Sequence, residues 1–114
     1  MTILMYASKK NFDTQKAERF FKERRVPLQV VDMKKHKLGE RELQNIAKGK
    51  LSELIDREDK RVKEHPACYY DRDSLLLPAI LENPWLLRSP IVRCGSRVTV
   101  GYQPEQWTEW LAQG

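Results

Sequence analysis

The chain has 114 residues, of which 40% are hydrophobic and 32% charged, a balance typical of one ordered domain. No apolar run approaches the roughly 20 residues of a membrane-spanning helix, and the first residues lack the basic stretch and long apolar core of a signal peptide. We therefore expect a cytoplasmic protein without a membrane partner. The net charge of +5 suits an acidic partner, but basic and acidic residues are interleaved, so nucleic-acid binding is not indicated.

The first third of the chain predicts a strand, a helix and a second strand. The strand covers Thr2 to Ala7, and the helix runs from about Asp13 to Arg25. Its apolar face consists of Ala17, Phe20, Phe21 and the aliphatic stem of Arg24. Pro27 ends the helix before a strand over Leu28 to Met33. The two strands should be parallel, with a right-handed crossover.

The middle of the chain predicts helices with many charges. One helix covers Gly39 to Ala47, and residues 56–65 form either an exposed helix or a mobile connection. Asp73 or Ser74 then caps a further helix. Its predicted buried stripe is Leu77, Ile80 and Leu81, and Pro78 requires a start near Leu76 or Leu77.

The last third predicts a hairpin followed by a helix. Strands over Leu86 to Arg93 and Arg97 to Tyr102 have only a short connection, which makes them antiparallel. The final helix opens at Pro104 and buries Trp107, Trp110 and Leu111. The order βαβ, helical insertion, ββα indicates an α/β fold: a thioredoxin-like, four-stranded mixed sheet with an inserted helical lobe. We expect one domain over residues 1–114, with its core at about 1–33 and 74–114 and the insertion at about 38–73.

The loop between the first strand and the first helix, residues 8–12, is where a thiol-reductase domain keeps its nucleophile. Backbone N–H groups and the positive end of the helix would favour a thiolate there, as would Lys9 and Lys10. The loop nevertheless contains no cysteine, because the two cysteines of the chain are Cys68 and Cys94.

Two segments resemble a known family. Met5-Tyr6, with Asn11 five residues after the tyrosine, is similar to the opening of arsenate reductases of the ArsC type and of their relatives, the Spx regulators of RNA polymerase. Residues 82–92, with the sequence ENPWLLRSPIV, resemble the "NP-x-L-[IL]-[KR]-R-P-I-[IV]" stretch of that family, and residues 97–102 resemble the hairpin strand that follows it.

The resemblance also identifies departures from the family pattern. It implies that Asn11 stands at the nucleophile position and Thr14 at the second cysteine of Spx-type proteins. It places Ser89 where the reductases have an arginine associated with the oxyanion substrate, while Arg88 is retained. It further implies a cis peptide bond between Ser89 and Pro90.

These residues change the chemistry that the loop can perform. An asparagine amide is no nucleophile, but its oxygen is a good helix N-cap acceptor, and a serine cannot replace the bidentate arginine. The residues that remain to contact a small oxyanion or an acidic partner are Ser8, Lys9, Lys10, Asn11, Arg88 and Pro90. The alternative is that the lysines are solvated loop charges.

We therefore expect a degenerate ArsC/Spx-like protein that binds another protein or regulates it, without thiol-reductase activity, cofactor or metal. The alternative is an arsenate reductase-like or glutathione-dependent oxidoreductase with a non-standard thiol. Cys94 is the candidate thiol because Arg93 and Arg97 flank it, whereas Cys68 lies in an aromatic linker that favours burial. Glutathione would then pair with the backbone of Ser89 and Ile91 beside Pro90.

Overall fold

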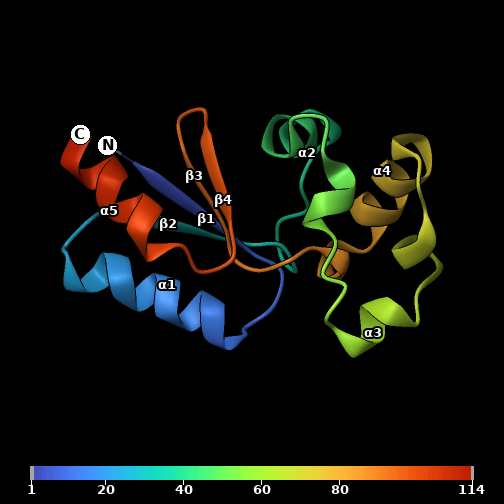
Figure 1. The fold of residues 1–114 in the computed structure, drawn as a ribbon, viewed down its shortest axis with the longest axis horizontal. Coiled ribbons are helices and arrows are strands. Elements are labelled where there is room, and N and C mark those ends of the chain that lie inside the picture. The colour runs from blue at the N-terminus through green and yellow to red at the C-terminus, as the bar shows by residue number, and fades with distance from the viewer. Residues whose placement is uncertain (1, 114) are drawn as a thin grey trace. The chain divides into compact units, whose positions relative to one another are not determined.

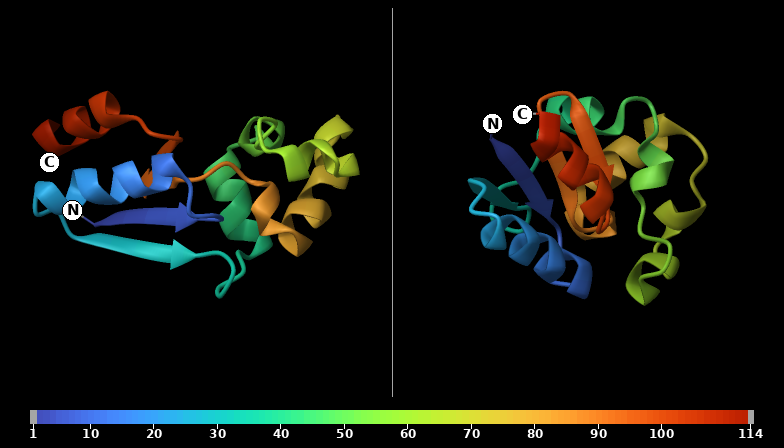
Figure 2. Two further views of the ribbon diagram at one scale, coloured as in Figure 1. Left: turned by 90° about the horizontal axis from the view of Figure 1, so that it is seen from below. Right: turned by 60° about the vertical axis from the view of Figure 1, so that its left-hand side comes forward.

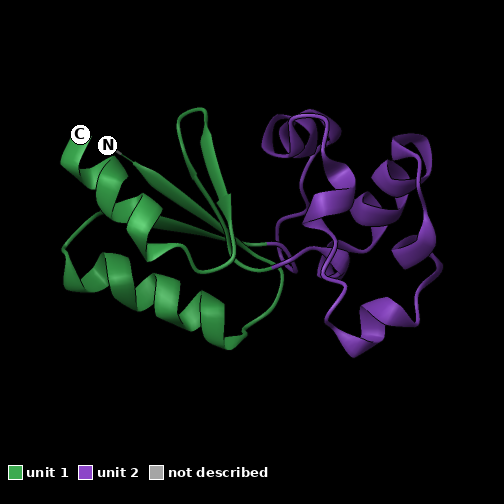
Figure 3. Ribbon diagram, in the orientation of Figure 1, with its two compact units in different colours: residues 1–32, 89–114 green, residues 33–88 purple. Residues whose placement is uncertain are grey.

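The computed structural model describes residues 2–113 (Figure 1). The chain forms two compact units, one from residues 1–32 and 89–114 and one from residues 33–88 (Figure 3). The first unit contains the sheet, and the second contains short helices. The assignment of residues 1–114 to one domain stays a prediction.

The sheet of the first unit has four strands in the order β2-β1-β3-β4. The strands are β1 (Ile3–Ala7), β2 (Leu28–Asp32), β3 (Ile91–Cys94) and β4 (Arg97–Val100). β1 pairs with β2 in parallel and with β3 antiparallel, and β3 pairs with β4 antiparallel. This mixed sheet confirms the predicted fold class.

Two helices, α1 (Phe12–Glu23) and α5 (Pro104–Gln113), lie on one face of this sheet (Figure 2). Pairing of Met5 with Val92 and of Val92 with Thr99 directs these side chains to that face. The buried core between sheet and helices consists of Ile3, Met5, Ala17, Phe20, Phe21, Val92, Trp107 and Trp110. Each fully buried large apolar side chain contributes about 1.5–3 kcal/mol, so this cluster fixes α1 and α5 on the sheet.

Trp107 is the centre of this core. It is fully buried, and its ring contacts those of Phe20, Phe21 and Tyr102 at centroid distances of 5.4, 5.0 and 5.6 Å. Its Nε1–H donates to Thr99 Oγ1 at 2.7 Å, so the buried donor is satisfied.

The second unit consists of short helical segments. These are α2 (Glu40–Ala47), η1 (Leu51–Leu54), α3 (Lys60–Lys63), η2 (Pro66–Tyr69), α4 (Asp73–Glu82) and η3 (Pro84–Leu86). The charged stretch 56–65 holds the single turn α3, which begins after Asp59, whose carboxylate accepts from the Arg61 N–H at 2.9 Å. Val62 of this turn is fully buried, which gives the charged stretch an apolar anchor.

Three sequence-based expectations about α4 are wrong. The helix begins at Asp73 with Arg72 as its N-cap, so Pro78 lies inside the helix. Of the predicted buried stripe, Ile80 is buried as expected, but Leu77 and Leu81 are half-buried, and Leu76 is buried in their place. The reason is that α4 is apolar on several sides, so the spacing of its leucines does not single out one face.

The expected strand over residues 86–90 is also wrong. Pro84 opens η3, and β3 begins only at Ile91, because Pro90 has no N–H to contribute to a ladder. β4 ends at Val100, since Gly101 takes a positive φ of 82° and donates its N–H to Pro90 O at 2.8 Å. The other boundaries differ from the predicted ones by a residue or two.

Candidate functional site

The loop from β1 to α1 and the segment before β3 lie side by side in the first unit. β1 ends at Ala7, and its residue Tyr6 pairs with Ile91, the first residue of β3. The residues just before Ile91 therefore lie beside the residues just after Ala7. Within the loop Ser8 is buried, Lys9 is half-buried and Lys10 is exposed.

Asn11 is the N-cap of α1, which confirms its predicted capping role. Its Oδ1 accepts the Thr14 N–H at 2.8 Å, and its Nδ2 donates to Ser89 O at 2.9 Å. The same side chain thus satisfies one free N–H of the helix end and joins the helix to the segment before β3.

The hydroxyl groups of Thr14 and Ser89 complete a closed network. Their oxygens are 2.6 Å apart, and both side chains are at most 5% exposed. Thr14 Oγ1 also lies 2.7 Å from Asn11 Oδ1, and Ser89 Oγ donates to Lys9 O at 3.1 Å. If Ser89 donates to Thr14, the Thr14 proton goes to Asn11 Oδ1; if Thr14 donates to Ser89, the Ser89 proton goes to Lys9 O. Both hydroxyl protons therefore have an acceptor in either arrangement. We call Asn11, Thr14 and Ser89 with the Lys9 carbonyl the polar staple.

The Ser89–Pro90 peptide bond is cis, as the resemblance implied. Pro90 is buried, and its carbonyl accepts the Gly101 N–H. The segment before β3 is therefore held from β4 on one side and from α1 on the other.

The polar staple has little capacity for acid–base or nucleophilic chemistry. Its side chains are one amide and two hydroxyls, and none of them ionises near neutral pH. Among residues 2–113 there is also no group of three His, Cys, Asp or Glu side chains that could hold a metal ion. The geometry is that of a structural connection between α1 and β3.

The other expected site residues are not brought into this network. Arg88 belongs to the second unit, where its N–H donates to Leu54 O at 2.8 Å, and its side chain is exposed. Cys68 lies half-buried in η2 of the second unit. Cys94 lies half-buried at the end of β3 and packs against the core of the first unit.

The position of Cys94 separates it from Asn11. β3 begins beside the loop at Ile91 and ends at Cys94, about 10 Å further along at the roughly 3.3 Å rise of a strand. Because β1 and β3 are antiparallel, Cys94 lies toward the start of β1, whereas Asn11 follows its end.

Sequence reasoning missed the role of Thr14, which it treated only as a position without a second cysteine. Thr14 is the third residue of α1, so Asn11 and Thr14 have the spacing of an N-cap and its reciprocal partner. That spacing was the available signal. The link from Thr14 to Ser89 crosses 75 residues and leaves no local pattern.

A four-stranded mixed sheet in the order β2-β1-β3-β4, with α1 and α5 on one face, defines a thioredoxin-like domain, here with a helical insert. The model of the ArsC family matches residues 6–110. The chain belongs to the ArsC family.

Solved structures have the same fold. The YffB protein superimposes with a TM-score of 0.82 at 19% identity, covering 94% of this chain and 96% of its own. An arsenate reductase from Vibrio cholerae superimposes with a TM-score of 0.80 at 21% identity, and the match covers 96% of this chain and 97% of the reductase. An arsenate reductase (ArsC) related protein from Brucella melitensis superimposes with a TM-score of 0.74 at 18% identity, and the match covers 97% of this chain and 95% of that protein. No curated protein matches the sequence. None of the helices in residues 2–113 is long and apolar enough to cross a membrane.

Proposed function

We propose that this ArsC-family protein is a protein-binding or regulatory module without thiol-reductase activity at the loop before α1. The observation that carries the proposal is the polar staple: Asn11 engages Thr14 and Ser89 through both ends of its amide. If Asn11 stands at the nucleophile position, as the resemblance implies, the catalytic position has become part of the scaffold. Thiol chemistry needs an attacking thiolate, and an amide cannot supply one.

The same geometry bears on oxyanion binding at the loop. The Thr14 N–H, which an oxyanion at the helix N-terminus would use, already donates to Asn11 Oδ1. An oxyanion would have to displace this neutral acceptor, and Ser89 offers no guanidinium to compensate.

The surface around the staple favours contact with a protein. Phe12, next to Asn11, is 80% exposed, and Lys10 is exposed beside it. Exposed aromatic side chains with cationic neighbours are typical of partner contacts. Because Ser8 and Pro90 are buried, we propose that Lys9, Lys10 and Phe12 provide the contact in this loop.

The test combines turnover with partner binding. We expect no arsenate or disulfide reduction above the protein-free rate, with either glutathione or thioredoxin as reductant. We also expect partner capture by the wild-type protein to be lost in Lys10→Glu/Phe12→Ala and kept in Lys22→Glu, which makes the same charge change near the other end of α1. Turnover that Cys94→Ser or alkylation abolishes would establish the alternative, an oxidoreductase with a non-standard thiol.

A restored thiol tests whether the loop still has the electrostatics of a thiolate site. In a Cys68→Ser/Cys94→Ser background, we expect the pKa of the thiol in Asn11→Cys to lie below its ordinary value. The reason is that the Thr14 N–H and the helix end would stabilise the thiolate. Alkylation rate against pH measures this, with the exposed mid-helix Glu18→Cys as control. Equal pKa values in the two variants would show that the loop confers no such stabilisation.

A further inference from the structure

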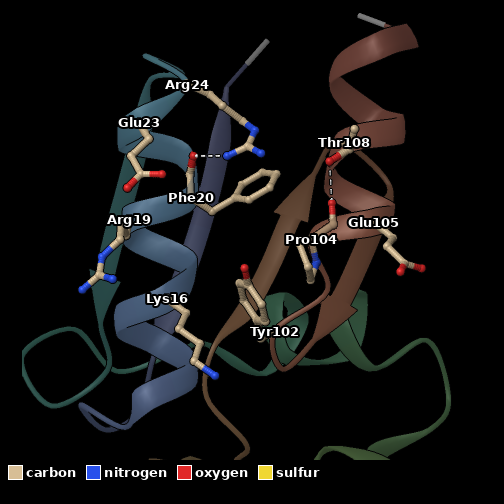
Figure 4. Close-up of a pocket in the computed structure, with 9 residues that line it drawn as sticks. All are labelled: Lys16, Arg19, Phe20, Glu23, Arg24, Tyr102, Pro104, Glu105 and Thr108. Carbon is tan, nitrogen blue, oxygen red and sulfur yellow. Dashed lines mark hydrogen bonds between the residues drawn. The ribbon is translucent and has the colours of Figure 1, made fainter.

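A groove of about 560 Å³ lies between α1 and the start of α5, within the first unit (Figure 4). Its volume falls in the range of roughly 300–1,000 Å³ that is usual for ligand sites. One wall comes from α1, and the other comes from Tyr102, Pro104 and Thr108. The groove is separate from the polar staple, and sequence reasoning did not identify it.

A single row of side chains forms the α1 wall. Lys16, Phe20 and Arg24 are four residues apart, so they follow one another along the same side of the helix. Phe20 is 5% exposed and forms the floor together with Tyr102. The two cations stand at opposite ends of this floor.

Both cations lie over aromatic rings. Lys16 Nζ is 5.5 Å from the centroid of the Tyr102 ring, and Arg24 Cζ is 3.7 Å from that of Phe20. Arg24 Nη1 also donates to the Phe20 carbonyl at 3.2 Å. Cation–π contacts and this hydrogen bond hold the charges at the groove without neutralising them.

The charges that face the groove are positive. The side chains of Arg19, Glu23 and Glu105 also border it, but Figure 4 shows their charged ends pointing away from the space between α1 and α5. Within residues 2–113 neither Lys16 nor Arg24 has a carboxylate within ion-pair distance. The groove therefore offers an aromatic floor with an unneutralised cation at each end.

We propose that this groove binds an extended acidic segment of a protein partner, with the pattern acidic-x-apolar-x-acidic. Lys16 and Arg24 are separated by about 12 Å along α1, at a rise of about 1.5 Å per residue. In an extended peptide, residues four apart are separated by about 13 Å, and the residue midway between them points to the same side. The two carboxylates then meet Lys16 and Arg24, while the apolar side chain contacts Tyr102 and the small part of Phe20 that Arg24 leaves exposed.

This inference rests on the proposed function, because it assumes that the chain acts by binding a protein. It adds the chemistry of the partner and a second surface. The net charge of +5 favours the approach of such a segment over long range.

The test is a titration with a fluorescein-labelled peptide containing Glu-Ser-Leu-Ser-Glu, followed by anisotropy and by amide shifts of the protein. We expect saturable binding, with the largest shifts in residues 16–24 and 102–108. Binding should weaken as salt is raised from 50 to 500 mM, since the ion pairs are exposed. The control peptides are Gln-Ser-Leu-Ser-Gln, which lacks the charges, and Glu-Leu-Glu-Ser-Ser, which keeps them at the wrong spacing.

Protein variants assign the binding to the groove. Lys16→Gln and Arg24→Gln should each weaken binding about threefold to fivefold, the effect of one exposed ion pair of up to about 1 kcal/mol. The matched control Lys22→Gln removes an equal charge from another side of α1 and should leave binding within twofold. Thr108→Trp, which fills the groove from α5, should abolish binding.

If Lys22→Gln weakened binding as much as Lys16→Gln, the peptide would be attracted by the overall positive charge and not by the groove. That result would overturn the proposal. Equal binding of the two Glu-containing peptides, or no binding at millimolar peptide, would also overturn it. None of these results would touch the proposed function at the Asn11 loop, which the turnover assays and the Lys10→Glu/Phe12→Ala capture test separately.

Discussion

Asn11 performs two structural tasks with the two ends of one amide. Its oxygen accepts from the Thr14 N–H, and its nitrogen donates to the carbonyl of Ser89, 78 residues away in the chain. Aspartate could perform only the first task, since it has no N–H donor at neutral pH. Asparagine is therefore the residue that both caps α1 and attaches it to the segment before β3.

The first prediction concerns the stability that this amide provides. Asn11→Ala should lower the free energy of unfolding by about 2 kcal/mol or more, because it removes an N-cap worth about 1 kcal/mol and takes the side-chain donor from the carbonyl of the buried Ser89. Asn11→Asp should lose less, because it keeps the cap. Urea denaturation with an unchanged m-value measures both, and Lys10→Ala, at an exposed neighbour, serves as control. A loss below about 0.5 kcal/mol in Asn11→Ala would mean that water replaces the amide without cost.

For single residues, the sequence predicts the contacts that form between residues close together in the chain. Asn11 before an amphipathic helix indicates an N-cap, and the structure confirms it. The bond between the Thr14 and Ser89 hydroxyls depends on a β-sheet bringing two distant segments together, and no spacing in the sequence encodes it. The spacing of Lys16, Phe20 and Arg24 does place them along one side of a helix. Whether they line a groove depends on where α5 packs, which the sequence does not indicate.

The helix α4 shows how an element can be predicted while its details are not. The candidate caps Asp73 and Ser74 indicate a helix with a start near Leu76 or Leu77, and the structure has one that begins earlier, at Asp73–Glu82. Leu75, Leu76, Leu77, Ile80 and Leu81 surround most of its circumference, so tertiary packing decides that Leu76 and Ile80 are buried. The same packing tolerates Pro78 beyond the first turn, against the rule that places prolines at helix starts.

The second prediction tests the cost of that proline. Pro78 is exposed and lies where its ring removes the hydrogen bond that residue 78 would make to Ser74 O. Pro78→Ala should therefore raise the free energy of unfolding by about 1 kcal/mol or more. This is a net value, because alanine makes the unfolded chain more flexible and that costs roughly 0.4–1 kcal/mol of the gain. Pro66→Ala is the matched control, since Pro66 stands at the start of η2. Pro66→Ala should lower the free energy of unfolding. If Pro78→Ala lowered it as well, the hydrogen bond missing at Pro78 would carry no cost in α4.

At the scale of the whole chain, the order of elements was enough to predict the topology. A βαβ unit followed later by a hairpin has few ways to form one sheet, and the order β2-β1-β3-β4 is among them. The division after residue 32 lies close to the expected end of the first core segment at about residue 33, whereas the division after residue 88 lies well beyond the expected end of the insertion at about residue 73. The second boundary is harder to read because the short helices of the second unit lack long periodic patterns. The first unit is discontinuous in sequence, so its four-stranded sheet is complete only when β1 pairs with β3.

This discontinuity sets the third prediction, on the order of folding. Met5 in β1 pairs with Val92 in β3, so most of the chain forms the intervening loop. Contacts of such sequence separation are slow to form, and we expect them after the transition state. Val92 is fully buried, and Val92→Ala should lower the free energy of unfolding by about 2 kcal/mol, almost all of it as faster unfolding.

Folding and unfolding rates from tryptophan fluorescence in urea measure this effect. The control is Leu43→Ala in α2, a buried residue in a helix whose contact with η1 spans few residues. Because these local contacts close a short loop, Leu43→Ala should slow folding as well as speed unfolding. If Val92→Ala slowed folding as much as Leu43→Ala does, the β1–β3 pairing would belong to the folding nucleus. The polar staple, which forms at the same junction of the two chain ends, would then be assembled early instead of late.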